Sequence, residues 1–242
     1  MDLLGQDGDE AIRTVSLVRH YTLGRTVIPA VDGVSLAARR GEFVALLGTS
    51  GSGKSTLLNL IAGLDRADSG AIVVDGQDLA TLNSFELACY RRHTVGMVFQ
   101  SFNLVPSMTL YENVELPMRF AEIKRRERKQ RAREALERVG LSDRMKHRPS
   151  EMSGGEQQRA AIARALVNQP KILLADEPTG NLDSKTGTEI MELIRTLNRT
   201  LEMTVMMVTH ERPLAERYAH RMVFLGDGKL LGETESKMGA AR

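Results

Sequence analysis

Tryptophan is absent from this 242-residue sequence, and Cys89 is its single cysteine. One cysteine excludes an intrachain disulfide framework and a zinc site built from several thiolates. The five histidines, at positions 20, 93, 147, 210 and 220, include no HxxxH pair, so they lack a spacing typical of metal sites. These absences favour a reducing compartment and a protein without a structural metal ion.

Long apolar runs are also missing. The longest unbroken run, Phe43–Leu47, has five residues, against the roughly 20 that a membrane-spanning helix needs. The first ten residues, MDLLGQDGDE, are acidic and have no apolar core, so we expect no signal peptide there. If the protein works at a membrane, we expect another polypeptide to span it.

Neither sign of charge dominates, because 33 Lys and Arg stand against 31 Asp and Glu. No overall basic field therefore indicates nucleic-acid binding. Basic residues do gather at 124–133, as in sites for nucleic acid or acidic lipid, but no aromatic residue lies among them to stack on bases. Two glutamates are spaced for i,i+4 ion pairs with arginines: Glu127 with Arg131 and Glu134 with Arg138. This spacing favours a solvated helix face.

The order of strand and helix patterns predicts an α/β fold. Short strand patterns occupy 14–19, 34–37 and 43–47, and a helix follows a glycine-rich loop from Lys54 to about Gly63. Between about Pro106 and Pro149 strand patterns vanish, and 122–139 is helical and highly charged. Strands and helices then alternate from 172 to 225, as in a parallel sheet covered by helices.

We therefore predict one domain over residues 1–242. Its α/β core has a largely parallel sheet and an N-terminal antiparallel β region, and spans about 12–100 and 166–232. An inserted α-helical subdomain occupies about 101–165.

The glycine-rich loop at 48–56, GTSGSGKST, fits the pattern GxxxxGK[ST] between an apolar strand and a helix, which predicts a P-loop NTPase core. Its glycines let backbone N–H groups turn inward onto phosphate oxygens, and the following helix adds its positive N-terminal end. Lys54 would lie near the β- and γ-phosphates, and the Ser55 hydroxyl would bind Mg²⁺. Nine residues make up this predicted site: Gly48, Thr49, Ser50, Gly51, Ser52, Gly53, Lys54, Ser55 and Thr56.

The strand pattern at 172–175 leads directly into two carboxylates, Asp176 and Glu177. A buried strand delivers its last residues to the carboxyl edge of the sheet, where α/β proteins form their sites. There Asp176 would hold Mg²⁺, and Glu177 would polarise the attacking water as a general base. Taken alone, an ordinary acidic turn has the same pattern, but the phosphate-binding loop favours the catalytic interpretation.

A second candidate anion site begins at Ser153, where Ser-Gly-Gly precedes an alanine-rich helix. Backbone N–H groups at a helix N-terminus bind anions. Because one chain needs only one γ-phosphate site, the second cradle suggests contact with a nucleotide held by another copy. The alternative is that Ser153 is an ordinary helix N-cap.

Over residues 12–232 the order and spacing of these motifs resemble the ABC ATPases. Ser153, Gly154 and Gly155 are similar to the family signature LSGGQ, although Met152 and Glu156 replace its Leu and Gln. The resemblance implies roles for four further residues: Tyr21 stacking on adenine, Gln100 contacting Mg²⁺ and the membrane-domain interface, Asp183 in the D-loop, and His210 as the switch histidine at the γ-phosphate. It thereby implies a catalytic set of Lys54, Glu177 and His210 and a metal-binding set of Ser55, Gln100 and Asp176.

Residues 101–117 and 175–183 are similar to a narrower branch, which serves macrolide export, lipoprotein release and related bacterial systems. The resemblance implies an ATP-hydrolysing subunit of a bacterial ABC transport complex, with ATP and Mg²⁺ as cofactors. It implies a homodimer in the ATP state and an integral membrane permease as partner, with no nucleic acid. It also implies a cytoplasmic protein, peripheral on the inner face of the cell membrane.

The apolar stretch at 100–117 is the segment that we expect to contact the permease. Burial against the helices of the insertion is the alternative for its apolar side chains: Phe102, Leu104, Val105, Met108, Leu110 and Tyr111.

Two other functions compete with transport. A soluble ABC ATPase acting on nucleic acid or the ribosome is the main alternative, but ABC translation factors carry two cassettes, and this chain has one phosphate-binding loop and one signature. ABC repair ATPases insert a long coiled coil, whereas no sustained heptads separate the two motifs here. A P-loop kinase explains neither Ser153 nor His210.

Overall fold

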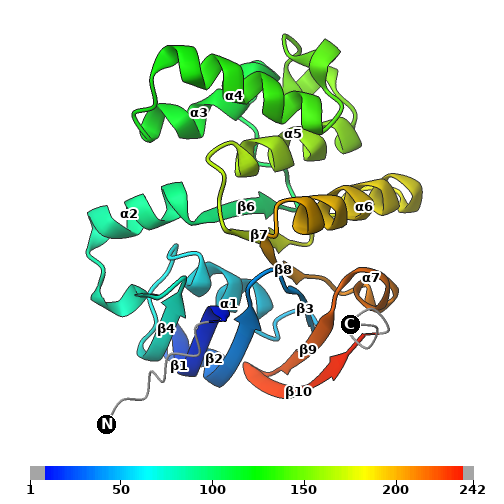
Figure 1. The fold of residues 1–242 in the computed structure, drawn as a ribbon. Helices are drawn as coiled ribbons and strands as arrows, with labels where there is room; N and C mark the ends of the chain where they lie inside the picture. Colours follow the sequence, from blue (N-terminus) through cyan, green and yellow to red (C-terminus); the bar gives the residue numbers. More distant parts are fainter. Residues whose placement is uncertain (1–8, 237–242) are drawn as a thin grey trace.

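The computed structural model describes residues 9–236. Residues 1–8, most of the segment expected not to be a signal peptide, lie outside the described residues, as do 237–242. Residues 9–236 form two β-sheets and seven α-helices (Figure 1). No helix in this range has the length and apolar character required to cross a membrane.

The first sheet is antiparallel, with the strand order β2-β1-β4-β5. Its strands are β1 (Glu10–Leu23), β2 (Thr26–Arg39), β4 (Ser69–Val74) and β5 (Gln77–Asp78). The predicted strands at 14–19 and 34–37 are therefore only the inner parts of one long hairpin. The outer part was missed because residues 20–29 are all exposed, so they show no inward–outward alternation.

The second sheet has the order β10-β9-β3-β8-β7-β6. Its strands are β3 (Phe43–Leu47), β6 (Val95–Phe99), β7 (Ile172–Asp176), β8 (Thr204–Val208), β9 (Arg221–Gly226) and β10 (Lys229–Glu235). All neighbours pair in parallel except β10, which is antiparallel to β9 at the edge. Every residue of β3 and of β8 is buried, as in a parallel sheet covered on both faces.

The helices are α1 (Lys54–Ile61), α2 (Ser84–His93), α3 (Leu110–Phe120), α4 (Arg125–Arg138), α5 (Gly154–Leu166), α6 (Ser184–Thr200) and α7 (Arg212–Tyr218). Short 3₁₀ turns occupy Leu79–Thr81, Ser142–Arg144 and Pro149–Glu151. Helices α3, α4 and α5 pack together in a layer at the top of Figure 1, away from the antiparallel sheet. The α/β fold with an inserted helical part is confirmed, whereas the exact domain limits stay a prediction.

Alternate residues of β3 face two different cores. Val44 and Leu46 lie in the core between the two sheets, together with α1. Phe43, Ala45 and Leu47 lie in the core on the opposite face, with residues of α3 to α7. Because successive side chains of a strand point to opposite faces, β3 is packed between the two cores. The loop that follows β3 is positioned by this packing.

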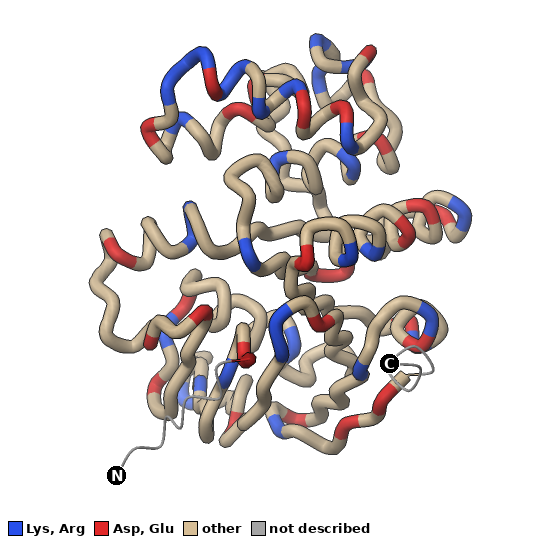
Figure 2. Tube along the Cα trace, in the orientation of Figure 1, with Lys and Arg blue, Asp and Glu red and all other residues tan. Residues whose placement is uncertain are grey.

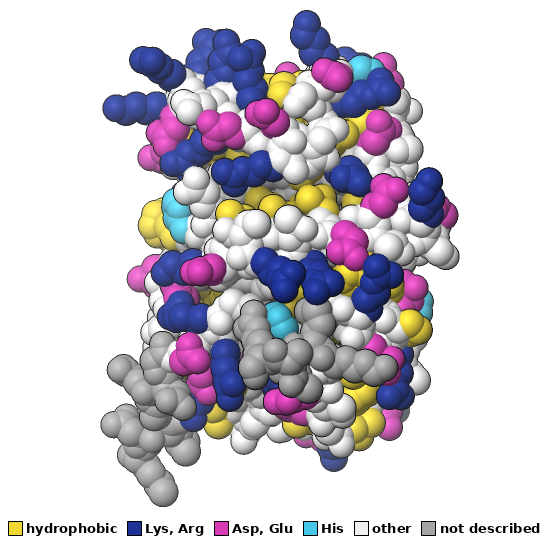
Figure 3. All heavy atoms as spheres, turned by 45° about the vertical axis from the view of Figure 1, so that its right-hand side comes forward, with side chains coloured by type: hydrophobic (Ala, Val, Ile, Leu, Met, Phe, Trp, Pro, Cys, Tyr) yellow, Lys and Arg dark blue, Asp and Glu magenta, His cyan; other side chains and the backbone are white. Residues whose placement is uncertain are grey.

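The charged helix α4 lies on the surface and is anchored by the buried Ala132 and Leu136. Its basic residues are part of the Lys and Arg groups at the top of the molecule (Figures 2 and 3). The expected pair of Glu127 and Arg131 forms. The pair expected between Glu134 and Arg138 was wrong, because Glu134 accepts a hydrogen bond of 2.9 Å from the amide of Gln130 instead.

Candidate functional site

The register of the parallel sheet brings four strand ends to one edge. Leu46 of β3 pairs with Val208, Val208 with Asp176, and Asp176 with Phe99. The residues that follow these strands therefore emerge side by side: the loop from Gly48, then His210, Glu177 and Gln100. This is the carboxyl edge, where the sequence predicted the site.

The loop from Gly48 to Gly53 fits so tightly that side chains are excluded at both ends. A Cβ atom at Gly48 would lie 2.2 Å from the carbonyl oxygen of Leu225, and one at Gly53 would lie 2.0 Å from that of Ala30. Gly51, with φ 81°, has the left-handed conformation that favours glycine. Sheet backbone thus holds the loop on both sides.

Lys54 begins α1, and only 6% of the residue is exposed. Its ammonium group donates to the carbonyl oxygens of Gly48 at 2.9 Å and Thr49 at 2.8 Å. Burial lowers the pKa of Lys54, and the nearby charges of Glu177 and Asp176 oppose this shift. The ammonium therefore lies inside the loop, bonded to its carbonyl oxygens.

Ser55 and Asp176 form the core of the predicted magnesium site. The Ser55 hydroxyl donates to Oδ1 of Asp176 at 3.0 Å. Burial and the charge of Glu177 raise the pKa of Asp176, against the effects of Ser55 and Lys54. Hydroxyl and carboxylate oxygens are the donors that Mg²⁺ prefers. Within residues 9–236 no three His, Cys, Asp or Glu side chains converge as a metal site, so phosphate and water oxygens would have to complete the coordination.

Glu177 and His210 face each other across the edge. The distance between Oε2 of Glu177 and Nδ1 of His210 is 3.4 Å. Glu177 has φ 45°, which is uncommon for a residue with a side chain, and its N–H donates to the carbonyl of Val208 at 3.0 Å. Its backbone is thus held in a strained conformation by β8, as often occurs at functional sites.

Gln100 and Asp183 lie in the loops beside Glu177. The carbonyl oxygen of Gln100 accepts from the side-chain amide of Asn181 at 3.0 Å. Asp183 caps α6 by accepting from the N–H groups of Lys185 and Thr186. The hydroxyl of Thr186 adds a bond of 2.6 Å, and these bonds lower the pKa of Asp183.

Ser153 is the N-cap of α5, a structural role that both interpretations of this turn share. Its hydroxyl donates to Oε2 of Glu156 at 2.9 Å, and the N–H of Glu156 donates back to the hydroxyl oxygen at 3.3 Å. This capping box explains the Glu at position 156. Position 155 has no room for a side chain, because a Cβ atom there would lie 2.4 Å from Cγ2 of Thr186. Among residues 9–236, no hydrogen bond or ion pair joins the turn at 153–155 to the loop at 48–56.

Several structural partners of the site were missed from the sequence. Gln158 is fully buried and donates at 2.6 Å to the carbonyl of Pro178, the residue after Glu177, while its own carbonyl oxygen has no partner in the described chain. It ties α5 to the turn that contains Glu177. Tyr21 is partly exposed and bonded to Asp65. Neither Gln158 nor Asp65 belongs to a recognised motif, so no sequence signal distinguished them.

Three of the six apolar residues expected at the permease contact pack inward. Leu110 is buried in the core beside the helical layer, and Leu104 and Tyr111 pack against that core. Burial against the insertion thus accounts for these three residues.

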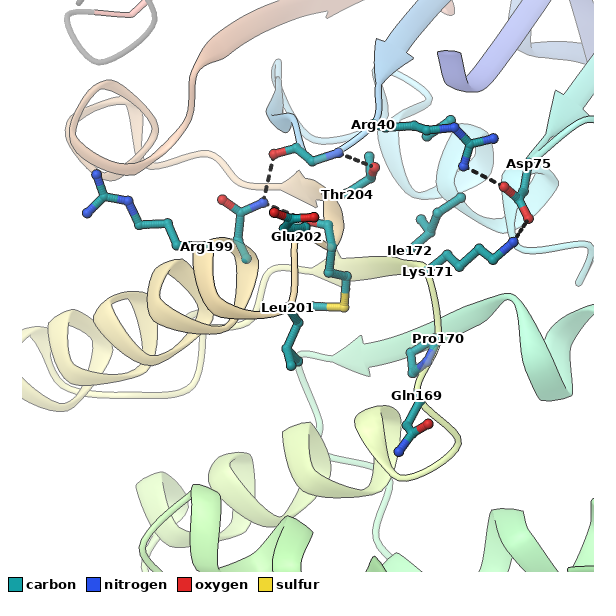
Figure 4. A pocket seen from close by; sticks show the side chains of 14 residues that line it. Arg40, Asp75, Gln169, Pro170, Lys171, Ile172, Arg199, Leu201, Glu202 and Thr204 are labelled. Atoms are coloured by element: carbon teal, nitrogen blue, oxygen red, sulfur yellow. Dashed lines mark hydrogen bonds and ion pairs between the residues drawn. The ribbon is translucent and has the colours of Figure 1, made fainter. Parts of the chain in front are cut away.

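A separate cavity of about 710 Å³ lies at the opposite, amino edge of the parallel sheet (Figure 4). Arg40 and Lys171 point at Asp75 from two sides there, each at 2.6 Å. These bonds lower the pKa of Asp75 although burial opposes them. The cluster joins the two sheets far along the strands from the phosphate-binding loop.

Comparison with known proteins identifies relatives for nearly the whole chain. Residues 31–180 match the family model described as ABC transporter. The macrolide export ATP-binding/permease protein MacB of Brucella melitensis is 46% identical over 230 residues, 95% of this chain but 35% of the relative. The lipoprotein-releasing system ATP-binding protein LolD of Geobacter metallireducens is 45% identical, over 92% of this chain and 98% of the relative.

A solved structure of an ATP-binding cassette is also similar to this chain over nearly its whole length. The ATP-binding cassette MJ0796, in a dimeric post-hydrolysis state bound to ADP and Pi, superposes with a TM-score of 0.86. It is 42% identical, and the match covers 93% of this chain and 98% of that one.

Proposed function

The chain belongs to the ABC transporter family as an ATP-binding subunit, and we propose that it hydrolyses ATP to drive a membrane permease. The observation that carries this proposal is the convergence of Lys54, the bonded pair Ser55 and Asp176, and Glu177 at one sheet edge. A triphosphate in the loop would replace the carbonyl oxygens that the Lys54 ammonium now contacts.

In the proposed reaction, Glu177 accepts a proton from water as the water oxygen attacks the γ-phosphorus. The bond from that phosphorus to the bridging oxygen breaks, giving ADP and phosphate. His210, 3.4 Å from Glu177, would hold the carboxylate and contact the γ-phosphate. Ser55, Asp176 and Gln100 would hold Mg²⁺, which neutralises charge on the phosphates.

The proposed active unit is a head-to-tail dimer with ATP between the subunits. No hydrogen bond or ion pair within residues 9–236 joins the turn at 153–155 to the phosphate-binding loop of its own chain. The N–H groups of Ser153 and Glu156 are engaged in the capping box, so the N–H groups of Gly154 and Gly155 would bind a partner's nucleotide. The dimeric form of the related cassette supports this arrangement.

The proposed permease contact is a groove of about 580 Å³ between α2, β6, α3 and α5. Met97, Leu116, Pro117 and Phe120 give it an apolar lining, and Phe120 is 63% exposed. Gln100 directly follows β6, the strand that carries Met97 and Phe99. Docking of the permease in the groove would therefore change the position of Gln100 at the proposed magnesium site. Such a partner would place the protein on the cytoplasmic side of the membrane, in macrolide export or lipoprotein release, the activities named for its relatives.

Isothermal titration with Mg-ATP and phosphate release test this function. Lys54→Ala should abolish ATP binding at millimolar concentration and leave the circular dichroism spectrum unchanged. Lys229→Ala, which removes an exposed ammonium paired with Asp32 at 3.3 Å, is the matched control and should bind ATP normally. Near-normal affinity in Lys54→Ala would disprove the assignment of the loop.

A further inference from the structure

A cluster of charged side chains holds Tyr21 in the hairpin whose second strand contacts the phosphate-binding loop. Tyr21 is 38% exposed, yet its hydroxyl donates to Oδ2 of Asp65 at 2.7 Å. The guanidinium carbon of Arg19 lies over the ring, 4.8 Å from its centroid. A hydrogen bond and a cation–π contact therefore hold an aromatic ring that reaches the surface.

Arg19 is itself held on two sides. Its Nε donates to Oδ2 of Asp65 at 3.0 Å and its Nη1 to Oδ1 of Asp68 at 2.9 Å. Asp68 also accepts from the backbone N–H of His20 at 2.6 Å. Burial alone would raise the pKa of Asp65. The hydrogen bonds from Tyr21, the Arg66 N–H and Arg19 lower this pKa overall. The cluster is therefore ionised at neutral pH and spans β1 and the segment after α1.

The position of this ring relates it to the triphosphate site. Tyr21 pairs with Ile28 of β2, two residues before Ala30, whose carbonyl oxygen closes against Gly53. Asp65 follows α1, the helix that begins at Lys54. Both connections from Tyr21 thus lead to the phosphate-binding loop, one through the hairpin and one through α1.

Ordering an exposed side chain costs conformational entropy. That the Tyr21 ring is nevertheless held by Asp65 and Arg19 indicates that its orientation has a function. We propose that Arg19, Asp65 and Asp68 are positioning residues that hold Tyr21 as a ready-made stacking platform for the nucleotide base. The proposal rests on the proposed function and on the stacking role that the resemblance to ABC ATPases implies for Tyr21. Because Arg19 covers one face of the ring, the base stacks on the other face. Order present before binding lowers the cost of binding.

The test compares Mg-ATP with Mg-tripolyphosphate, which has the phosphates but no base. Asp65→Ala and Arg19→Ala should raise the Kd and KM for ATP roughly five- to tenfold, from lost stacking and preorganisation. The kcat for phosphate release and the Kd for tripolyphosphate should stay within about twofold of wild type. Asp65→Ala combined with Tyr21→Ala should bind ATP no more weakly than Tyr21→Ala alone, because the two act through one ring.

Asp75→Ala is the matched control. Asp75 also holds two cations, Arg40 and Lys171, but at the amino edge of the sheet, so its loss should lower thermal stability and leave both ligands bound as in wild type. Should Asp65→Ala fold poorly, Arg19→Lys keeps the charge and loses the planar contact with the ring.

Three results would overturn the inference. If tripolyphosphate binding weakens as much as ATP binding, the cluster supports only the loop. If Tyr21→Ala weakens ATP binding but Asp65→Ala and Arg19→Ala do not, positioning fails while the proposed function stands. If Tyr21→Ala binds ATP normally, the role assigned to Tyr21 fails, and the inference fails with it.

Discussion

Gly53→Ala should damage the protein far more than Gly51→Ala, although both glycines have a positive φ, 95° and 81°. Alanine in a left-handed conformation costs about 1–2 kcal/mol at either position. At Gly51 the new methyl group meets no atom within 4 Å, whereas at Gly53 it would lie 2.0 Å from the carbonyl oxygen of Ala30. Because that atom belongs to a β-strand, the loop must move by about 1 Å, which adds roughly 1–3 kcal/mol.

Thermal unfolding by circular dichroism measures this difference. At about 2–4 °C per kcal/mol for a chain of this size, Gly53→Ala should melt several degrees below Gly51→Ala. A shift of about 1 Å in positioning groups can cost on the order of 10²-fold in function, so phosphate release should fall far more in Gly53→Ala. Equal melting temperatures in the two variants would refute the claim that β2 presses on the loop.

Two further predictions concern charge and assembly. Burial alone would raise the pKa of Glu115, but bonds from Arg119 and Arg128 lower it overall. Its stabilisation is thus present above the ordinary carboxyl pKa of about 4.3 and lost as the pH falls through the lowered folded value. In urea unfolding, Glu115→Gln should lower the free energy of unfolding by about 1–3 kcal/mol at pH 7 and by much less at pH 3. The control Glu127→Gln, in an exposed pair, should lower it by under about 1 kcal/mol. An equal loss of stability in Glu115→Gln at both pH values would contradict this prediction. In light scattering with Mg-ATP, Glu177→Gln should form a dimer, and adding Ser153→Arg should return it to monomer; a dimeric double variant would refute a signature interface.

The sequence predicted the parts of the fold that follow from burial and turn chemistry. The run at 43–47 matches β3 residue for residue, because a strand buried on both faces is continuously apolar. The helix α2 was missed: its mean hydropathy is low and only Leu87 and Tyr90 are buried, so no apolar stripe marked it. Its N-terminal signal was present, since Asn83 and Glu86 form a capping box.

The candidate site was predictable where chemistry follows local motifs and not where it depends on long-range contacts. Lys54, Ser55 and Asp176 were expected together because a phosphate loop and a carboxylate strand end meet at one edge, and Ser55 does bond to Asp176. The contact of Tyr21 with Asp65 joins residues 44 positions apart, and that of Gln158 with Pro178 spans an entire strand. Such contacts depend on packing that no single segment encodes.

The central claim is that Glu177 is the base that hydrolyses ATP at this edge, and phosphate release from Glu177→Gln tests it most directly. The substitution keeps the shape of the side chain and its contact distance to His210 but removes the basic carboxylate. Glu137→Gln, at an exposed position of α4, serves as control and should match wild type. We predict a rate lower by a factor on the order of 10²–10⁴ with Mg-ATP still bound; more than about half of the wild-type rate would contradict the account.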